Sequence, residues 1–246
     1  MKKQPLRLAK DPIVEAIAEL RFEPAQPNAG DLLPGMIFPD VKDVLPKIER
    51  LPLAEMPRQI QEADVNLKYG PTQRLSGNQF ALLLGNRVAT IACAHPYVGW
   101  EKFRSLINRI LLKINSTGMV KNVERFSVKY VNLLEAKDRI EQYAFLNLKA
   151  SLGQYSLTDH LSNFRTEIAM DRMLTIVEIT PAVDVQTQQG AKLHGLLFSI
   201  DTICVIGNDF WKEPLTVIDD THATEKSIFY DLLTEKAIES FIPIWS

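Results

Sequence analysis

Residues 13–22 alternate strictly between two sets of side chains, and this pattern constrains the fold more than any other feature of the chain. Successive side chains of a β-strand point to opposite faces, so each set would lie on one face of a strand. Prolines at positions 12 and 24 bound the segment. One set is wholly apolar, which predicts a strand with one buried face. The first set is Ile13, Glu15, Ile17, Glu19 and Arg21, and the apolar set is Val14, Ala16, Ala18, Leu20 and Phe22.

The rest of the first half combines short strands with one clear helix. Apolar residues from Trp100 to Ile114 recur at steps of three and four, which predicts an amphipathic helix ended by Gly118. Three antiparallel strands are predicted between residues 65 and 93, with a strand-like start at 65–69 and a type II′ turn at Gly85-Asn86. The other expected elements are one or two short helices within 29–50, a connector at 52–57 and a long strand at 123–134.

The second half is mostly strand. Strands are expected at residues 143–152, 163–170, 174–182 and 196–206, with a polar loop at 186–192 and a closing helix at 221–241. Asp171-Arg172 predicts a tight connection, and Thr234 predicts an N-cap that restarts the closing helix. Helices follow runs of strands instead of single strands, so the order predicts an α+β fold: largely antiparallel sheet covered by amphipathic helices.

Composition fits a chain that fills its own core. It has 246 residues, of which 46% are hydrophobic and 24% charged, and this excludes intrinsic disorder. We expect an N-terminal half at 1–138 and a C-terminal half at 139–246, packed as one compact unit. The two cysteines, Cys93 and Cys204, lie in strand-like apolar runs and predict buried, reduced thiols. With no signal-peptide pattern and no apolar membrane span, we expect a cytoplasmic protein without membrane contact.

Three segments resemble a sporadically distributed bacterial family of uncharacterised proteins of about this length. They are residues 12–22, with the pattern PxVEAxxxxRF, residues 97–103, with YxGWExF, and residues 125–132, with RxSxxYxN. Members are similar also in a late Ser199-Ile-Asp201 strand and a closing helix from His222 to Phe241. The resemblance implies no assigned activity, and the patchy distribution is like that of genes in mobile or defence-related modules. Members have Arg where this chain has Lys129, so a role that needs a guanidinium group does not carry over.

The charged residues of two strands form the first candidate site. Glu15 and Arg21 share the polar face of the first strand, and Arg125 and Lys129 share that of the 123–134 strand. If the strands are neighbours, these side chains form either a salt-bridge ladder, which we favour, or the floor of a binding groove. Tyr130 and Asn132 lie on the opposite, apolar-rich face of the second strand, where we expect Asn132 to belong to a buried hydrogen-bond network. These residues are the candidate binding residues: Glu15, Arg21, Arg125, Lys129, Tyr130 and Asn132.

Catalytic and metal chemistry find little support. Cys93 and His95 share one strand face and could pair a thiol with a base, but no oxyanion-hole pattern accompanies them. Zinc ligation by Cys93, His95, His160, His194 and His222 would need spacings that match no known motif. We therefore predict no catalytic residue, no metal site and no cofactor, and an enzyme is the third hypothesis behind two binding functions.

Charge is unevenly distributed although the formal net charge is only −2. Residues 99–130 hold seven basic and two acidic residues, whereas residues 201–246 hold three basic and nine acidic ones. Complementary patches can pair within the chain, pair between subunits or steer a charged partner. Nucleic acid is disfavoured because the aromatic residues lie on the apolar face of the basic helix. The candidate interface residues are Arg104, Arg109, Lys113, Phe210 and Trp211, the last two of which by default cap the core.

Two functional hypotheses follow. The first is a non-enzymatic protein-interaction component, with a protein partner or self-association, as an accessory or antitoxin-like part of a mobile or defence-related gene module. The second is a small-ligand-binding protein with an apolar cavity between the sheet and the closing helix.

Overall fold

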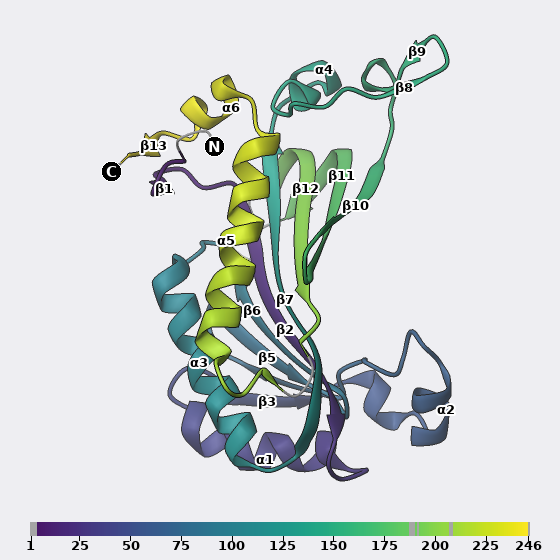
Figure 1. Cartoon of the computed structure of the whole chain (residues 1–246), viewed down its shortest axis with the longest axis vertical. Coiled ribbons are helices and arrows are strands. Elements are labelled where there is room, and N and C mark those ends of the chain that lie inside the picture. The colour runs from purple at the N-terminus through teal and green to yellow at the C-terminus, as the bar shows by residue number, and fades with distance from the viewer. Residues whose placement is uncertain (1–3, 187–189, 191, 207–208, 246) are drawn as a thin grey trace.

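The chain is built on a nine-stranded antiparallel sheet (Figure 1). The structure is a computed structural model that describes residues 4–186, 190, 192–206 and 209–245. The strand order is β10-β11-β12-β7-β2-β6-β5-β4-β3, so the longest strands lie in the middle of the sheet and the exposed strands β10 and β3 form its two edges. The strands are β2 (Ile13–Pro24), β3 (Lys47–Arg50), β4 (Gln73–Ser76), β5 (Phe80–Leu84), β6 (Val88–Ala94), β7 (Val120–Glu135), β10 (Phe164–Met170), β11 (Met173–Gln186) and β12 (Lys192–Cys204).

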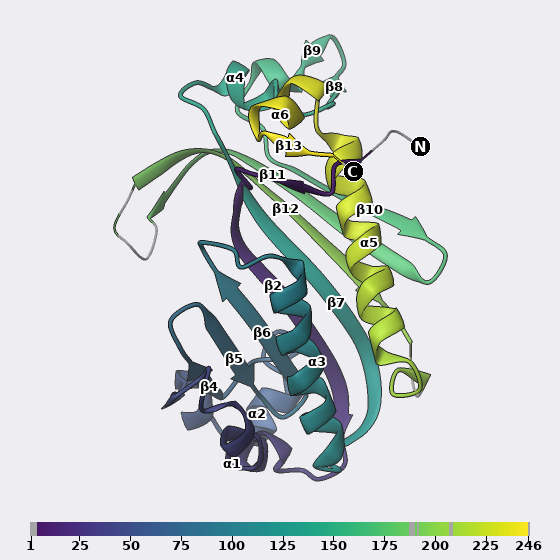
Figure 2. The same cartoon turned by 90° about the vertical axis from the view of Figure 1, so that its left-hand side faces the viewer.

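Three helices cover one face of this sheet: α1 (Ala29–Val41), α3 (Trp100–Ser116) and α5 (Pro214–Leu232) (Figures 1 and 2). We call this the helix face, and the opposite side the second face. The two chain ends pair as a small ribbon of β1 (Arg7–Leu8) and β13 (Pro243–Ile244). The remaining short elements are η1 (Pro52–Glu55), α2 (Arg58–Ala63), α4 (Arg139–Tyr143), β8 (Ser151–Leu152), β9 (Tyr155–Ser156), η2 (Leu157–Asp159) and α6 (Glu235–Ser240).

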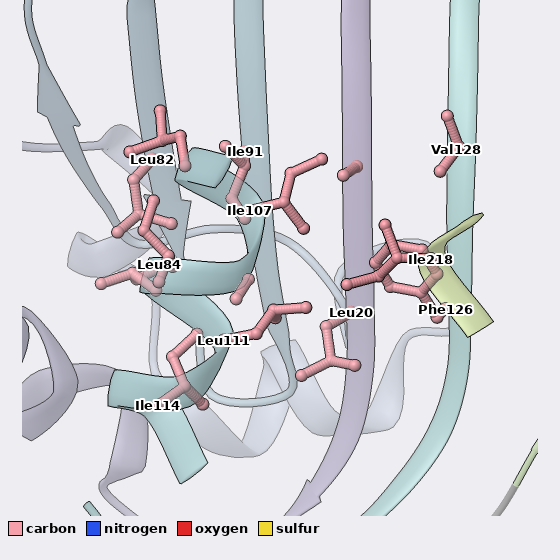
Figure 3. Packing of buried hydrophobic residues seen from close by; sticks show 14 of the residues in the cluster. Leu20, Leu82, Leu84, Ile91, Ile107, Leu111, Ile114, Phe126, Val128 and Ile218 are labelled. Carbon is pink, nitrogen blue, oxygen red and sulfur yellow. The ribbon is translucent and has the colours of Figure 1, made fainter. Parts of the chain in front are cut away.

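The apolar set of β2 supplies the centre of the helix face. Ala16, Ala18, Leu20 and Phe22 are all buried, whereas Glu15 is exposed, as the alternation predicts. Helix α3 packs on these strands through a stripe of six buried residues, some of which Figure 3 shows against the strands: Phe103, Leu106, Ile107, Ile110, Leu111 and Ile114. Burial of such side chains is the main source of stability, at about 25 cal/mol for each Å² of apolar surface.

The core consists of two clusters on the same face. The larger one lies under α1, α3 and the start of α5, and the smaller one lies around β11, β12 and the end of α5. The expected boundary between the two halves, after residue 138, does not divide the sheet. Strand β7 of the first half pairs with β12 of the second, from Phe126 opposite Cys204 to Glu135 opposite Gly195. Both expected halves therefore contribute strands to one sheet.

The α+β fold predicted from element order is confirmed. The three strands between 73 and 94, the helix from Trp100, the long strand β7 and the tight Asp171-Arg172 connection are also confirmed. The predicted N-cap is present, since the Thr234 hydroxyl accepts a hydrogen bond of 3.3 Å from the Ala237 amide at the start of α6. The described residues contain no helix that is both long and apolar enough to cross a membrane.

Two predicted strands are wrong, and side-chain hydrogen bonds explain both. Residues 65–69 form turns after α2, where the Asp64 carboxylate accepts a hydrogen bond of 2.7 Å from the Asn66 amide. Of residues 143–152 only Ser151–Leu152 forms a strand, as β8, because the segment begins in helix α4, which Asp138 caps by accepting from the Glu141 amide at 2.9 Å. Local hydrogen bonds thus favour a turn or a helix over extended chain where both segments begin.

Two boundaries and one turn also differ from the prediction. Residues 47–50 form edge strand β3 instead of helix, and the closing helix begins at Pro214, seven residues before the expected start. The β5–β6 hairpin forms, but Gly85 has no positive φ, so its turn is not type II′. Gly85 is required for close approach instead, because a Cβ there would lie 2.4 Å from the Gly70 carbonyl oxygen. Most of the expected polar loop at 186–192 lies outside the described residues.

Candidate functional site

A cleft of about 780 Å³ opens on the helix face between the sheet and α5. Its floor is β7 and its walls are α5, the loop at 97–99 and the first turn of α3. The β1–β13 ribbon and residues 9–13 close one side. Figure 2 shows how β7, α3, α5 and β13 are arranged. The volume is in the range of small-molecule sites. The lining residues used below are Asp11, Tyr97, Val98, Trp100, Tyr130, Asn132, His222, Glu225, Lys226 and Tyr230.

A chain of hydrogen bonds crosses the floor of the cleft. The hydroxyls of Tyr97 and Tyr130 share a hydrogen bond of 2.9 Å, and the Tyr130 hydroxyl lies 3.3 Å from Nδ1 of His222. The two tyrosine rings meet edge to face, with centroids 5.6 Å apart. Burial raises the pKa of both tyrosines, so the hydroxyls stay protonated and available as donors.

His222 is held as a neutral imidazole. Its ring stacks on Trp100 with centroids 3.7 Å apart, which fixes its orientation at the first turn of α3. Burial lowers the pKa of His222 to about 4, and the nearby positive charge of Lys226 acts in the same direction against a smaller opposing effect of Asp219. At neutral pH the imidazole therefore adds hydrogen-bonding capacity to the cleft but no charge.

Glu225 is the most unusual side chain of the cleft. It lies on the sheet-facing side of α5, and only 4% of its surface is exposed. No residue in the described parts of the chain forms a hydrogen bond or ion pair with its carboxyl group. Burial raises the pKa of Glu225 well above its usual value, and the positive charge of Lys226 offsets this only in part. Burial therefore favours the protonated acid.

Two further ionisable groups lie where the chain ends border the cleft. The Lys226 ammonium donates a hydrogen bond of 2.9 Å to the Leu6 carbonyl, and burial lowers its pKa. Asp11 accepts a hydrogen bond of 3.2 Å from the Ile13 amide, and burial raises its pKa. Both groups are thus occupied by contacts with the N-terminal segment.

The structure divides the six candidate binding residues between two surfaces. Tyr130 and Asn132 line the cleft, whereas the other four belong to the second face of the sheet. Asn132 is buried and donates a hydrogen bond of 3.2 Å to the Phe198 carbonyl on β12, which confirms the structural contact expected of it. Tyr130, in contrast, sits in the middle of the hydrogen-bond chain described above.

Charged side chains on the second face form the expected ladder. Strands β2 and β7 are neighbours, with Arg21 opposite Arg125, and both arginines bind the Glu19 carboxylate, at 2.7 and 2.9 Å. The Lys129 ammonium lies 3.7 Å from Glu178 on β11. Although Glu15 is exposed, neighbouring atoms desolvate its carboxyl group and raise its pKa, and Lys129 partly counteracts this. The floor of the cleft lies on the other side of the same strands.

The candidate interface residues make contacts within the chain. Arg104 on α3 binds Asp219 of α5 through two bonds of 2.5 and 2.6 Å. Arg109 binds the carboxylate of Asp43 and the backbone carbonyl of Asp40, and the Lys113 ammonium lies 2.8 Å from the Asp40 carboxylate. The basic helix thus pairs its charge within the chain, partly with the acidic C-terminal region. Phe210 is fully buried and Trp211 packs beside it, so these aromatics cap the core.

The thiol and histidine candidates both lie near the start of β2. Cys93 is buried and burial raises its pKa, while the His95 ring lies 3.2 Å from the Ile13 carbonyl. Both cysteines are free thiols. Among the residues that the structure describes, no three or more His, Cys, Asp or Glu side chains are grouped so that they could hold a metal ion.

Sequence reasoning missed the residues that make the cleft distinctive. Glu225 stands seven residues after Ile218 and four before Phe229, so it occupies a position of the apolar stripe of α5. A charged residue within an apolar stripe can be recognised in the sequence, and it would have identified Glu225 as a candidate. His222 and Trp100 are residue types common in binding sites, but nothing near them in the sequence indicates that they stack on each other.

Comparison with known proteins adds no family and no relative: no family model matches the chain, and no curated protein matches it either. The resemblance seen in the three sequence segments therefore stays a prediction.

Proposed function

We propose that the protein binds a small molecule in the cleft between the sheet and α5. The observation that carries this proposal is Glu225, a buried carboxyl group that borders the cleft and finds no partner in the described residues. Such a position is unfavourable for a carboxylate, because burial disfavours its charged form. Functional sites are where proteins tolerate such positions.

The rest of the cleft supports the same function. Binding sites for small molecules are typically apolar and aromatic, with a few polar groups that orient the ligand. Here Tyr97, Trp100 and Tyr230 supply aromatic surface, and the Tyr130–His222 hydrogen bond supplies polar groups that are already fixed in position. The sequence-based expectation of an apolar cavity between the sheet and the closing helix corresponds to this place in the fold.

A thermal-shift screen of metabolite-like compounds tests the proposal. Val98 is a half-buried lining residue, so Val98→Trp should fill the cleft, and Val65→Trp is the matched control at a position 82% exposed and outside the cleft. A ligand at a hundred times its Kd stabilises the folded state by about 2.7 kcal/mol, or roughly 5–10 °C at this chain length. We expect compounds that stabilise the wild type and Val65→Trp but not Val98→Trp. Compounds that stabilise all three proteins equally, or a screen without any stabilising compound, would contradict the proposal.

Self-association is a second candidate function. It is the form of the protein-interaction hypothesis in which the partner is another copy of the same chain. Edge strand β10 pairs only with β11 and is exposed along most of its length. In an antiparallel pair of two β10 strands centred on Thr166, Arg165 of each copy would lie opposite Glu167 of the other. This sequence is therefore complementary to itself in charge, which favours a second copy of the chain as the partner.

A charge swap tests this second candidate. Light scattering after gel filtration, over a wide range of protein concentration, should show dimers of the wild type. Arg165→Glu would place like charges opposite each other and should weaken the dimer, and the double variant Arg165→Glu, Glu167→Arg should restore it. A wild type that stays monomeric at all concentrations, or a double variant no better than the single one, argues against a β10 interface.

A further inference from the structure

We propose that the ligand of the cleft carries a positively charged organic nitrogen, which binds the carboxylate of Glu225 within the aromatic lining of the cleft. This inference rests on the proposed binding function and names the chemical class of its ligand. The starting point is geometric: a nearly fully buried carboxyl group borders a cavity of about 780 Å³ and has no partner among the described residues.

Among the described residues, no cation forms an ion pair with the carboxyl group of Glu225. Tyr97 and Tyr130 approach it from the 97–99 loop and β7, and Lys226 and Tyr230 approach it from α5 itself. The two former hydroxyls are already hydrogen-bonded to each other. The Lys226 ammonium forms its hydrogen bond with the Leu6 carbonyl and no ion pair with Glu225. Since no cation of the described residues forms an ion pair with this carboxyl, a ligand that enters the cleft can supply the counter-charge.

Aromatic side chains make the same cavity favourable for a cation. The rings of Tyr97, Trp100, Tyr130 and Tyr230 all line it. An ammonium group gains energy from the negative face of such rings, and more so when water is excluded. A carboxylate beside several aromatic rings is a combination that quaternary and methylated ammonium groups fit well, because they are weakly hydrated and lose little on entering an apolar site.

An anionic ligand fits the cleft less well. The carboxyl of Glu225 would repel it whenever ionised, and the neutral imidazole of His222 offers it no charge. Lys226 could attract an anion, but its ammonium is already bound to Leu6 at one side of the cleft. The polar donors that remain on the floor belong to the Tyr97–Tyr130–His222 chain, and they can accompany a ligand of either charge.

Cation binding should release a proton. The raised pKa of Glu225 favours the neutral acid, whereas a cation bound beside it would favour the carboxylate. The neutral acid and the cation together become a carboxylate–cation pair, and the proton passes to the buffer. Proton release thus distinguishes binding beside Glu225 from binding elsewhere in the cleft.

The experiment is calorimetric titration with matched probes. Choline and benzyltrimethylammonium are the cationic probes, 3,3-dimethylbutanol is the neutral isostere of choline, and benzoate is the anionic probe. Each titration is made at one pH in phosphate and in Tris, since the difference in heat between the buffers measures protons released. Two variants accompany the wild type: Glu225→Gln, and Asp231→Asn as a control at an exposed acidic position of the same helix.

We expect at least one cationic probe to bind the wild type and Asp231→Asn with release of protons. Glu225→Gln should bind the same probe at least about tenfold more weakly and release none, and the neutral isostere should bind at least about tenfold more weakly than choline. A different result is that the isostere or benzoate binds as tightly as the cations and that Val98→Trp abolishes this binding. This result would refute the inference of a cationic ligand but would support the binding function. Failure of both cationic probes to bind also overturns this inference, whereas the screen described above decides the binding function separately.

Discussion

Acidification should destabilise the protein through His222, and the size of this effect can be worked out. Burial lowers the pKa of His222 from 6.5 to about 4 in the folded state. Below pH 6.5 the unfolded chain therefore binds a proton that the folded chain does not, so stability falls as the pH falls. The loss attributable to this histidine is about 2 kcal/mol at pH 5 and about 3 kcal/mol once the pH is below 4.

Glu225 acts in the opposite direction over part of this range. Its folded-state pKa lies well above 4.5, so the stability that it contributes is complete below pH 4.5 and is lost as the pH rises. The pH profile of the wild type alone thus mixes two opposing slopes between pH 4.5 and 6.5. A comparison with His222→Gln removes the common contribution of Glu225 and isolates that of the histidine.

Urea denaturation of the wild type and His222→Gln at about pH 7.5, 6.5, 5.5 and 5 measures this contribution. The wild type should be the more stable protein at the highest pH, because the variant loses the stack on Trp100. Its advantage should shrink by about 2 kcal/mol at pH 5. A difference that stays constant with pH would refute the reasoning, and so would an NMR titration that places the folded-state pKa of His222 near 6.5.

Three further predictions concern stability. Relative to Glu225→Gln, the wild type should lose about 1.4 kcal/mol per pH unit from pH 4.5 up to the folded-state pKa of Glu225, as measured by urea denaturation at two pH values in that range. Gly195→Ala should lower the free energy of unfolding by about 1–3 kcal/mol, because its Cβ would lie 2.3 Å from the Leu134 carbonyl oxygen. In the same assay Gly35→Ala should stabilise α1 by about 0.5–1 kcal/mol, because its Cβ would meet no atom within 4 Å. Arg104→Ala should cost no more than about 1 kcal/mol despite its two short bonds to Asp219, since both side chains are partly exposed, and added salt should reduce the difference.

Patterns that repeat over many residues made most of the sheet and its main helix predictable. The alternation in residues 13–22 identifies both the strand β2 and its buried face, because a shift by one residue would expose Ala16, Leu20 and Phe22 together. The stripe from Phe103 to Ile114 identifies α3 in the same way. Residues 65–69 lack this redundancy and form turns, in which Asp64 accepts hydrogen bonds from the amides of Asn66, Leu67 and Lys68.

The residues that make the cleft distinctive could not be predicted to lie together, because they are distant in the sequence. The β1–β13 ribbon pairs Arg7 with Ile244, and the stack of Trp100 on His222 joins two helices more than a hundred residues apart. No local pattern brings such segments together. Tertiary packing alone places Glu225 beside the tyrosines of β7 and the 97–99 loop, so its role is visible only in the folded chain.

Strand β7 shows how one continuous motif serves two surfaces. Residues 125–132 look like one site in the sequence, since charged, aromatic and amide side chains follow one another closely. The pleat of the strand separates them: Arg125 and Lys129 join the ion pairs of the second face, and Tyr130 and Asn132 face the helices. The charged residues therefore have a sufficient structural explanation in the ladder. Tyr130 is the member of the motif that connects it to Glu225, which makes the helix face the side on which ligand chemistry is to be sought.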